Sequence, residues 1–155
     1  MTIDLKISHK MIRIIAVYLP HAGYDSNYFQ STLDDVERLI MEACDKRYAV
    51  VIGGDFNLSL DQGVRDRLLQ DLCAEFSLDI ANGTPLAENS NMWTFKSSWG
   101  NFNRLDYVLH SRSLQSSEVS ANLDLDMGSD HRNESVSMSY IRSKEAWKLR
   151  TRSFK

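Results

Sequence analysis

Apolar and polar side chains alternate over the first residues of the chain, which is the pattern of a β-strand. Residues 3–7 carry this period of two, and a turn at residues 8–10 would lead into a second strand over residues 11–18. Proline and glycine then interrupt the pattern over residues 19–23, which predicts a loop.

The pattern next changes to the period of a helix. Asp25 or Ser26 is suited to cap its N-terminus, and apolar residues follow at intervals of three and four. They form one stripe: Phe29, Leu33, Val36, Ile40 and Ala43. A second helix is expected over about residues 64–76, with Asp61 as its cap. Its apolar stripe would be Leu68, Leu72 and Phe76.

Short apolar runs elsewhere predict strands. Residues 48–52 form a continuous apolar run, which is typical of a strand buried on both faces. In the C-terminal half the strand candidates are residues 79–82, 92–96, 105–110, 118–123 and 134–140. Apolar residues alternate with serines in the last of these, so one of its faces should be buried. Strands joined by two helices indicate an α/β domain.

The composition suits one domain. The chain has 155 residues, of which 43% are hydrophobic, and this size allows a single core. No apolar run reaches the ~18 residues of a membrane span, and the N-terminus lacks the order of a signal peptide. Cys44 and Cys73 fall in helical patterns and are expected to be buried, reduced thiols, with a disulfide or a nucleophile as alternatives. We therefore expect an intracellular protein, cytoplasmic or nuclear, with no membrane partner.

Charge is unevenly distributed along the chain. Residues 142–155 contain six Lys/Arg and one Glu, whereas residues 1–141 carry 12 basic and 20 acidic side chains. We therefore divide the chain into a domain over residues 1–141 and a basic tail over residues 142–155. The tail predicts contact with phosphate or nucleic acid, and a solvated chain end is the alternative.

The most distinctive local motif is Gly53-Gly54-Asp55-Phe56-Asn57, directly after the apolar run. The two glycines would allow a tight turn. Asp55 and Asn57 would then project at the carboxyl end of a strand, where open α/β sheets bind ligands. The alternative is a polar turn in which both side chains bind only their own backbone.

Two further positions offer compatible chemistry. Asp130 and His131 place a metal-binding oxygen next to an imidazole that can transfer protons or stabilise negative charge. Asp106 falls on a predicted strand, on the opposite face from Tyr107. A carboxylate is costly to bury there unless it has a partner, and a histidine is one such partner.

In this order, with Tyr18-Leu19-Pro20 before them and Trp93-Thr94-Phe95 between, the motifs resemble the endonuclease/exonuclease/phosphatase superfamily. The resemblance extends from about Ile14 to Tyr140. It implies a partial DNase-I-like sandwich of the α/β class, in which a mixed β-sheet is flanked by helices. The segment Arg104-Leu105-Asp106-Tyr107 looks most like the apurinic endonucleases and the endonucleases of non-LTR (LINE-type) retrotransposons.

The resemblance implies metal-dependent hydrolysis of a phosphodiester, with DNA as the expected substrate and Mg²⁺ or Mn²⁺ as the cofactor. By analogy, Asp55 would orient or deprotonate the attacking water, and Asn57 would donate a hydrogen bond to the phosphate. Asp106 would orient His131, which would stabilise the charge that develops in the transition state. Three kinds of further contact are implied: Tyr18 as a phosphate donor, Asp130 as a metal ligand, and His21, Trp93 and Arg104 as substrate-binding residues. For Trp93, a place in the core or the cleft wall is the alternative.

The sequence departs from the family pattern at several points. His21 stands where many members have Asn, and Asn133 stands where Pro is frequent. The family's N-terminal strands, which carry an Asn, often followed by an Asp, and a metal-binding Glu, have no counterpart, since Asp4 is the only acidic residue before Tyr18. Because Mg²⁺ needs several oxygen ligands and Asp130 would be the main one left, we expect weak metal binding.

Three functions therefore stay open. The first is a nuclease, whose activity in this chain alone would be low. The second is a catalytically inactive relic that binds nucleic acid, and the third is a small-molecule phosphoesterase of the same fold. Half of a two-sheet sandwich would expose the inner apolar face of its sheet. We therefore expect a homodimer, poor solubility, or pairing with a missing N-terminal half.

Overall fold

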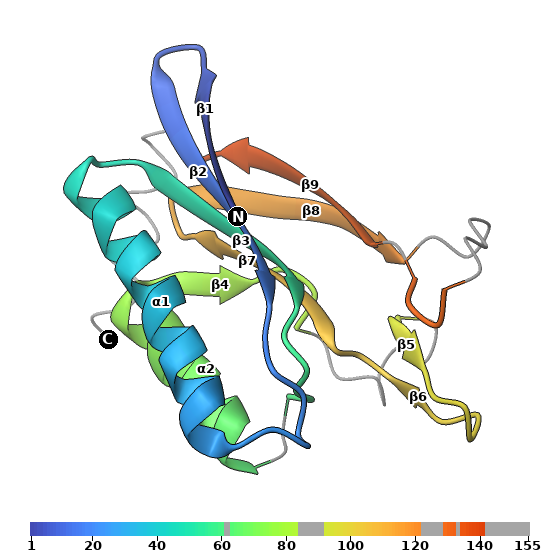
Figure 1. Cartoon of the computed structure of the whole chain (residues 1–155). Coiled ribbons are helices and arrows are strands. Elements are labelled where there is room, and N and C mark those ends of the chain that lie inside the picture. The colour runs from blue at the N-terminus through green and yellow to red at the C-terminus, as the bar shows by residue number, and fades with distance from the viewer. Residues whose placement is uncertain (61–62, 84–91, 122–128, 133, 142–155) are drawn as a thin grey trace, which may run out of the picture.

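A computed structural model describes residues 1–60, 63–83, 92–121, 129–132 and 134–141. Its elements, in chain order, are β1 (Thr2–Ile7), β2 (Lys10–Tyr18), α1 (Ser26–Asp45), β3 (Ala49–Asp55), α2 (Gly63–Glu75), β4 (Leu78–Ile80), β5 (Phe95–Lys96), β6 (Phe102–Asn103), β7 (Asp106–Ser111), β8 (Leu114–Ala121) and β9 (Glu134–Tyr140). Five strands form one sheet in the order β1-β2-β3-β7-β4, and β5–β6 and β8–β9 form two-stranded sheets (Figure 1). The main sheet is mixed, because β2 and β3 are parallel and its other pairs are antiparallel. The predicted α/β class is thereby confirmed.

The two helices cover one face of the main sheet (Figure 1). Asp25 caps α1 by accepting a hydrogen bond from the backbone of Asn27. The predicted stripe of α1 is buried in full: Phe29, Leu33, Val36, Ile40 and Ala43. It packs against the side chains that β2, β3 and β7 direct toward the helices, such as Ile15, Ile52 and Leu109. This layer is the main hydrophobic core.

Several predicted boundaries shift. In α2, Leu69 and Cys73 are buried beside Leu72, whereas the predicted Leu68 and Phe76 are only partly buried. The predicted cap Asp61 lies outside the described residues. β5 is shorter than expected and begins only at Phe95, although the N–H of Thr94 already donates to the carbonyl of Asn103 on β6. The strand β6 was not expected. Of the two free thiols, Cys73 is buried as predicted but Cys44 is exposed, because it lies off the apolar stripe of α1.

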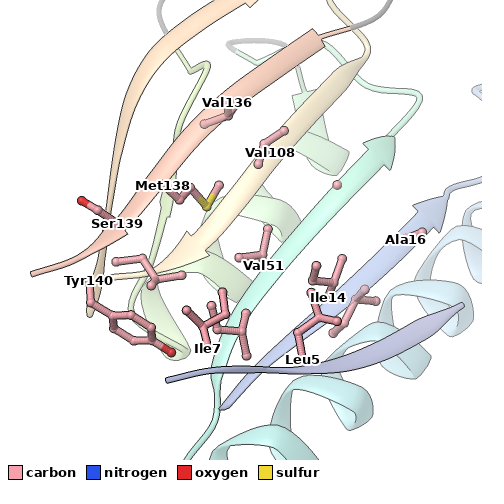
Figure 2. Close-up of a pocket in the computed structure, with 14 residues that line it drawn as sticks. Leu5, Ile7, Ile14, Ala16, Val51, Val108, Val136, Met138, Ser139 and Tyr140 are labelled. Carbon is pink, nitrogen blue, oxygen red and sulfur yellow. The ribbon is translucent and has the colours of Figure 1, made fainter. Parts of the chain in front are cut away.

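The opposite face of the main sheet is only partly covered. The β8–β9 pair packs there through Leu114 and Met138, against Ile12 and Ala49. A groove of about 470 Å³ stays open between the two sheets. Figure 2 shows apolar side chains of β1, β2, β3 and β7 that face Val136 and Met138 across it. Among the residues that the structure describes, helices therefore flank only one face of the sheet.

The paired glycines act differently from the predicted tight turn. β3 runs through both of them and ends at Asp55. A Cβ on Gly54, whose φ is +143°, would lie 2.0 Å from the carbonyl oxygen of Val17 on β2. Only glycine permits this close approach of the parallel strands. The glycine therefore holds the end of β3 against the end of β2.

The predicted basic tail, residues 142–155, lies outside the described residues. Among the residues that the structure describes, no helix is long and apolar enough to cross a membrane.

Candidate active site

Three adjacent strands bring polar side chains to one end of the main sheet. Tyr18 at the end of β2 is the register partner of Asp55 at the end of β3, and Asp55 is in turn opposite Asp106 at the start of β7. The alternation of each strand puts all three on the face opposite the helices, because their neighbours Ile15, Ile52 and others fill the helix-side core. Tyr18 is 72% exposed, so its hydroxyl is accessible to a ligand.

A short segment after residue 128 carries His131 to these carboxylates. The backbone N–H of Lys96 donates to the carbonyl of Asp130, and that of Arg132 donates to the carbonyl of Thr94. His131 also forms an isolated bridge with Phe95, and the two rings are 5.0 Å apart. The β5 segment, far from residue 131 in sequence, therefore fixes the histidine backbone.

His131 lies between two carboxylates. Its Nδ1 is 2.9 Å from Oδ2 of Asp106, and its Nε2 is 4.0 Å from Oδ2 of Asp55. Because a carboxylate only accepts, Nδ1 is the donor of the first contact. The second distance is too long for a hydrogen bond. Nε2 therefore stays available for a substrate oxygen, within the part of the chain that the structure describes.

Asp55 is held in place by Asn57. The Asn57 backbone N–H donates to Oδ1 of Asp55 at 2.8 Å, and its Nδ2 donates to Oδ2 at 2.9 Å. Nδ2 also donates to the carbonyl of Leu19 at 2.9 Å, which ties the β3 end to the loop after β2. Burial raises the pKa of Asp55, while the hydrogen bonds from Asn57 act in the opposite direction. A carboxylate with a raised pKa is a stronger base than an exposed one.

The hydrogen bonds of Asn57 bear on its predicted role as a donor to the phosphate. Both of its Nδ2 hydrogens bond within the protein, so contact with a phosphate would require it to give up the Asp55 or Leu19 bond. Asn57 also adopts a positive φ of 50°, a conformation that Asn tolerates better than most residues. Part of the turn-like alternative is therefore correct, since Asn57 binds Asp55 and local backbone, and the same bonds orient the carboxylate toward His131.

The predicted substrate-binding residues lie in three different environments. Arg104 is 4% exposed and donates to the carbonyls of Met92 and Asn82. These two bonds hold the guanidinium in the interior, so Arg104 supports the backbone near the start of β7 and does not face solvent. Trp93 is partly buried, with the guanidinium of Arg132 over its ring at 3.2 Å. His21 is exposed in the loop after β2, and its ring lies 4.6 Å from that of Tyr24.

Comparisons with known proteins identify the family and the fold. Residues 5–131 match the Endonuclease/Exonuclease/phosphatase family. The chain belongs to this family. No curated protein sequence matches it closely enough to count as a relative.

Solved structures of low sequence identity share the fold. D. rerio TDP2, complexed with a single strand DNA product, is 16% identical with a TM-score of 0.66, covering 89% of this chain and 60% of that one. The 3'-5' exonuclease NExo from Neisseria meningitidis is 18% identical with a TM-score of 0.64, covering 91% and 65%. A mannosyl-6-phosphatase from Bacteroides thetaiotaomicron is 13% identical with a TM-score of 0.59, covering 84% and 51%. The chain thus has the DNase-I-like fold and spans between 51% and 65% of the length of these structures.

Membership of the endonuclease/exonuclease/phosphatase family implies phosphoester hydrolysis and, in general, a divalent metal ion. The described residues do not fit such an ion. No three His, Cys, Asp or Glu side chains among them converge as a metal site. Asp55 and Asp106 accept hydrogen bonds from Asn57 and His131, and Asp130 is exposed. A complete Mg²⁺ site would need oxygen ligands beyond the described residues.

Sequence reasoning missed the residues that position Asp106. The hydroxyl of Thr94, which is fully buried, accepts hydrogen bonds from the backbone N–H groups of Leu105 and Asp106. Asn82 donates to the carbonyl of Asp106 and to Glu134. Thr94 lies in a segment that the sequence singled out, but neither Asn82 nor Glu134 belongs to a motif that would have identified it.

Proposed function

We propose that this protein hydrolyses phosphodiesters of nucleic acid, with Asp55 and His131 as the residues that act on the reacting groups. The observation that supports the proposal is the placement of one imidazole between two carboxylates, 2.9 Å from Asp106 and 4.0 Å from Asp55. A phosphoester needs a base for the attacking water and a positive group for the charge that builds up on oxygen. This site supplies both within one small volume.

In the proposed reaction, Asp55 accepts a proton from the water as the water oxygen attacks phosphorus. The ester bond from phosphorus to the leaving oxygen breaks, and the leaving oxygen takes up a proton from solvent. Asp106 keeps the Nδ1–H of His131 directed at itself, so that a protonated His131 presents its Nε2–H to a phosphoryl oxygen. Tyr18, whose hydroxyl is exposed beside Asp55, is placed to donate a further hydrogen bond to the phosphate. Mg²⁺ or Mn²⁺ is the expected cofactor of this class of enzyme. Asp130 would supply one oxygen ligand, and the other ligands would have to come from outside the described residues.

A polynucleotide is the favoured substrate. Two of the solved relatives are described as a DNA product complex and an exonuclease. Large aromatic side chains are exposed on the same polypeptide, including Trp99 at 90% next to β6 and Tyr18 at 72%. Exposed rings offer stacking surfaces to unpaired bases. The sequence Arg104-Leu105-Asp106-Tyr107 leads us to propose the retroelement-type endonucleases as the nearest class within the family.

The test is a nicking assay on supercoiled plasmid and on a labelled single strand, with Mg²⁺ or Mn²⁺ and with EDTA. Asp55→Asn and His131→Gln should each lower the rate by ~10²–10³, the usual effect of removing one such group. Asp71→Asn and His9→Gln, which change exposed residues away from the site, should leave the rate unchanged. Equal rates for the site variants and the wild type would refute the assignment.

Two outcomes would point to the alternative functions. Hydrolysis of a sugar phosphate with intact DNA would favour a small-molecule phosphoesterase, the class to which the mannosyl-6-phosphatase belongs. Binding of the labelled strand without cleavage under all metal conditions would favour an inactive nucleic-acid-binding protein.

A further inference from the structure

The edge of β7 beside the site is completed by a side chain and not by a strand. β4 pairs with β7 only as far as Ile80, opposite Leu109, and Ala81 then donates to the carbonyl of Val108. Beyond this point the side-chain carboxamide of Asn82 forms the hydrogen bonds to β7. Its Oδ1 accepts from the backbone N–H of Val108, and its Nδ2 donates to the carbonyl of Asp106, both at 3.0 Å. Asn82 thus occupies the place of a peptide group in the ladder.

A carboxyl group on a different sheet holds this carboxamide. Nδ2 of Asn82 also donates to Oε2 of Glu134, the first residue of β9. Glu134 follows His131 by three residues in the chain. The Asn82–Glu134 bond therefore connects the strand that carries Asp106 with the strand that follows His131.

We propose that Glu134 is a positioning residue for the Asp106–His131 pair, acting through Asn82. This proposal rests on the proposed function only in that the pair is the reacting site. Glu134 does not touch the imidazole. It fixes the Asn82 carboxamide, which in turn fixes the backbone of Asp106 and so the carboxylate that receives the Nδ1–H of His131.

The surroundings of Glu134 make this contact sensitive to protonation. Its second oxygen, Oε1, is buried and has no hydrogen-bond partner among the described residues. The charged groups that act on it are the Arg104 guanidinium, which favours the ionised form, and the Asp106 carboxylate, which disfavours it. Burial, together with Asp106, outweighs the effects of Arg104 and of the Asn82 hydrogen bond and raises the pKa of Glu134 to about 7. A carboxylate accepts a stronger hydrogen bond than a carboxylic acid, so ionisation of Glu134 strengthens its hydrogen bond from Asn82.

The experiment is a pH titration of the ¹⁵N-labelled full chain by NMR. Two signals report on the relay: the side-chain amide of Asn82, and the backbone amide of Tyr107, whose peptide group contains the carbonyl of Asp106. In the wild type both signals should move together in one step with a midpoint at about pH 7. In Glu134→Gln, which keeps an oxygen acceptor for Asn82 but cannot ionise, neither signal should show this step.

Glu118→Gln is the matched control, because Glu118 is an exposed glutamate on the paired strand β8, and it should titrate like the wild type. Glu134→Met replaces the carboxyl by an apolar group and serves for the same comparison if the glutamine variant does not fold. The proposal is overturned if Tyr107 stays still while Asn82 moves, or if the shared step survives in the Glu134 variant. Since neither signal depends on catalysis, this result is independent of the nicking assay.

Discussion

Replacing Gly54 by alanine should separate β2 from β3 at the end of the sheet that holds Asp55. The added Cβ would lie 2.0 Å from the carbonyl oxygen of Val17, and these are backbone atoms that cannot rotate away. A positive φ for a residue other than glycine costs roughly 1–2 kcal/mol. Moving the strands apart would also weaken two or so ladder hydrogen bonds, each worth about 1 kcal/mol net. We expect a loss of about 3–4 kcal/mol in the free energy of unfolding.

Gly53 provides a matched control one residue earlier on the same strand. A Cβ there would meet only the Cγ2 of Val108, at 4.0 Å, and it would point into the open groove. Gly53→Ala should therefore change stability by less than about 1 kcal/mol. Urea unfolding, followed by circular dichroism, measures both variants. Equal unfolding midpoints for Gly53→Ala and Gly54→Ala would show that β2 and β3 do not need a glycine at position 54. That result would also refute the role of Gly54 in placing Asp55.

Four other features lead to predictions. Burial raises the pKa of Glu134 from 4.5 to about 7. As the pH rises from 4.5 to about 7, the free energy of unfolding of the wild type should therefore fall relative to that of Glu134→Gln. The expected fall is about 1–2 kcal/mol after allowance for solvent screening of a half-buried group. A difference between their urea curves that does not depend on pH would contradict this. Cys44 is exposed, whereas Cys73 is buried with its pKa raised to about 11, so mass spectrometry after maleimide treatment at pH 8 should find one label on the native chain and two after unfolding. Thr94→Val would leave two partly buried backbone N–H groups without their acceptor. It should lower the free energy of unfolding by about 2 kcal/mol, measured by thermal or urea unfolding, and should lower the nicking rate. Unchanged stability would show that another acceptor replaces the hydroxyl. Light scattering should detect self-association of the wild type through the open apolar face. Leu5→Lys, on the exposed edge strand β1, should reduce this self-association. A monodisperse wild-type monomer would exclude self-association through this face.

Much of the local structure follows from the sequence, because it depends on interactions between near neighbours. The apolar stripe of α1 and its cap at Asp25 involve residues three or four positions apart, and both are present. The alternation around Asp106 also placed Tyr107 toward the core and the carboxylate on the other face, as observed. The family motifs singled out Asp55 and His131, which the fold then brings to within 4.0 Å of each other.

Other features depend on which segments meet in space, and no local pattern contains that information. The role of Gly54 depends on the carbonyl of Val17 on the neighbouring strand, 37 positions earlier in the chain. From the sequence alone, a glycine needed for this close approach could not be distinguished from a glycine needed for a tight turn. Arg104 was expected at the substrate because its neighbours match a motif, but it is buried and donates to the carbonyl of Asn82, two residues beyond the end of β4. The sequence by itself indicated the family, most of the elements and the candidate site residues. Only the tertiary structure decided how Asp106 and His131 are held, because the hydrogen bonds of Asn82 to Glu134 and to Asp106 join residues that are 52 and 24 positions apart.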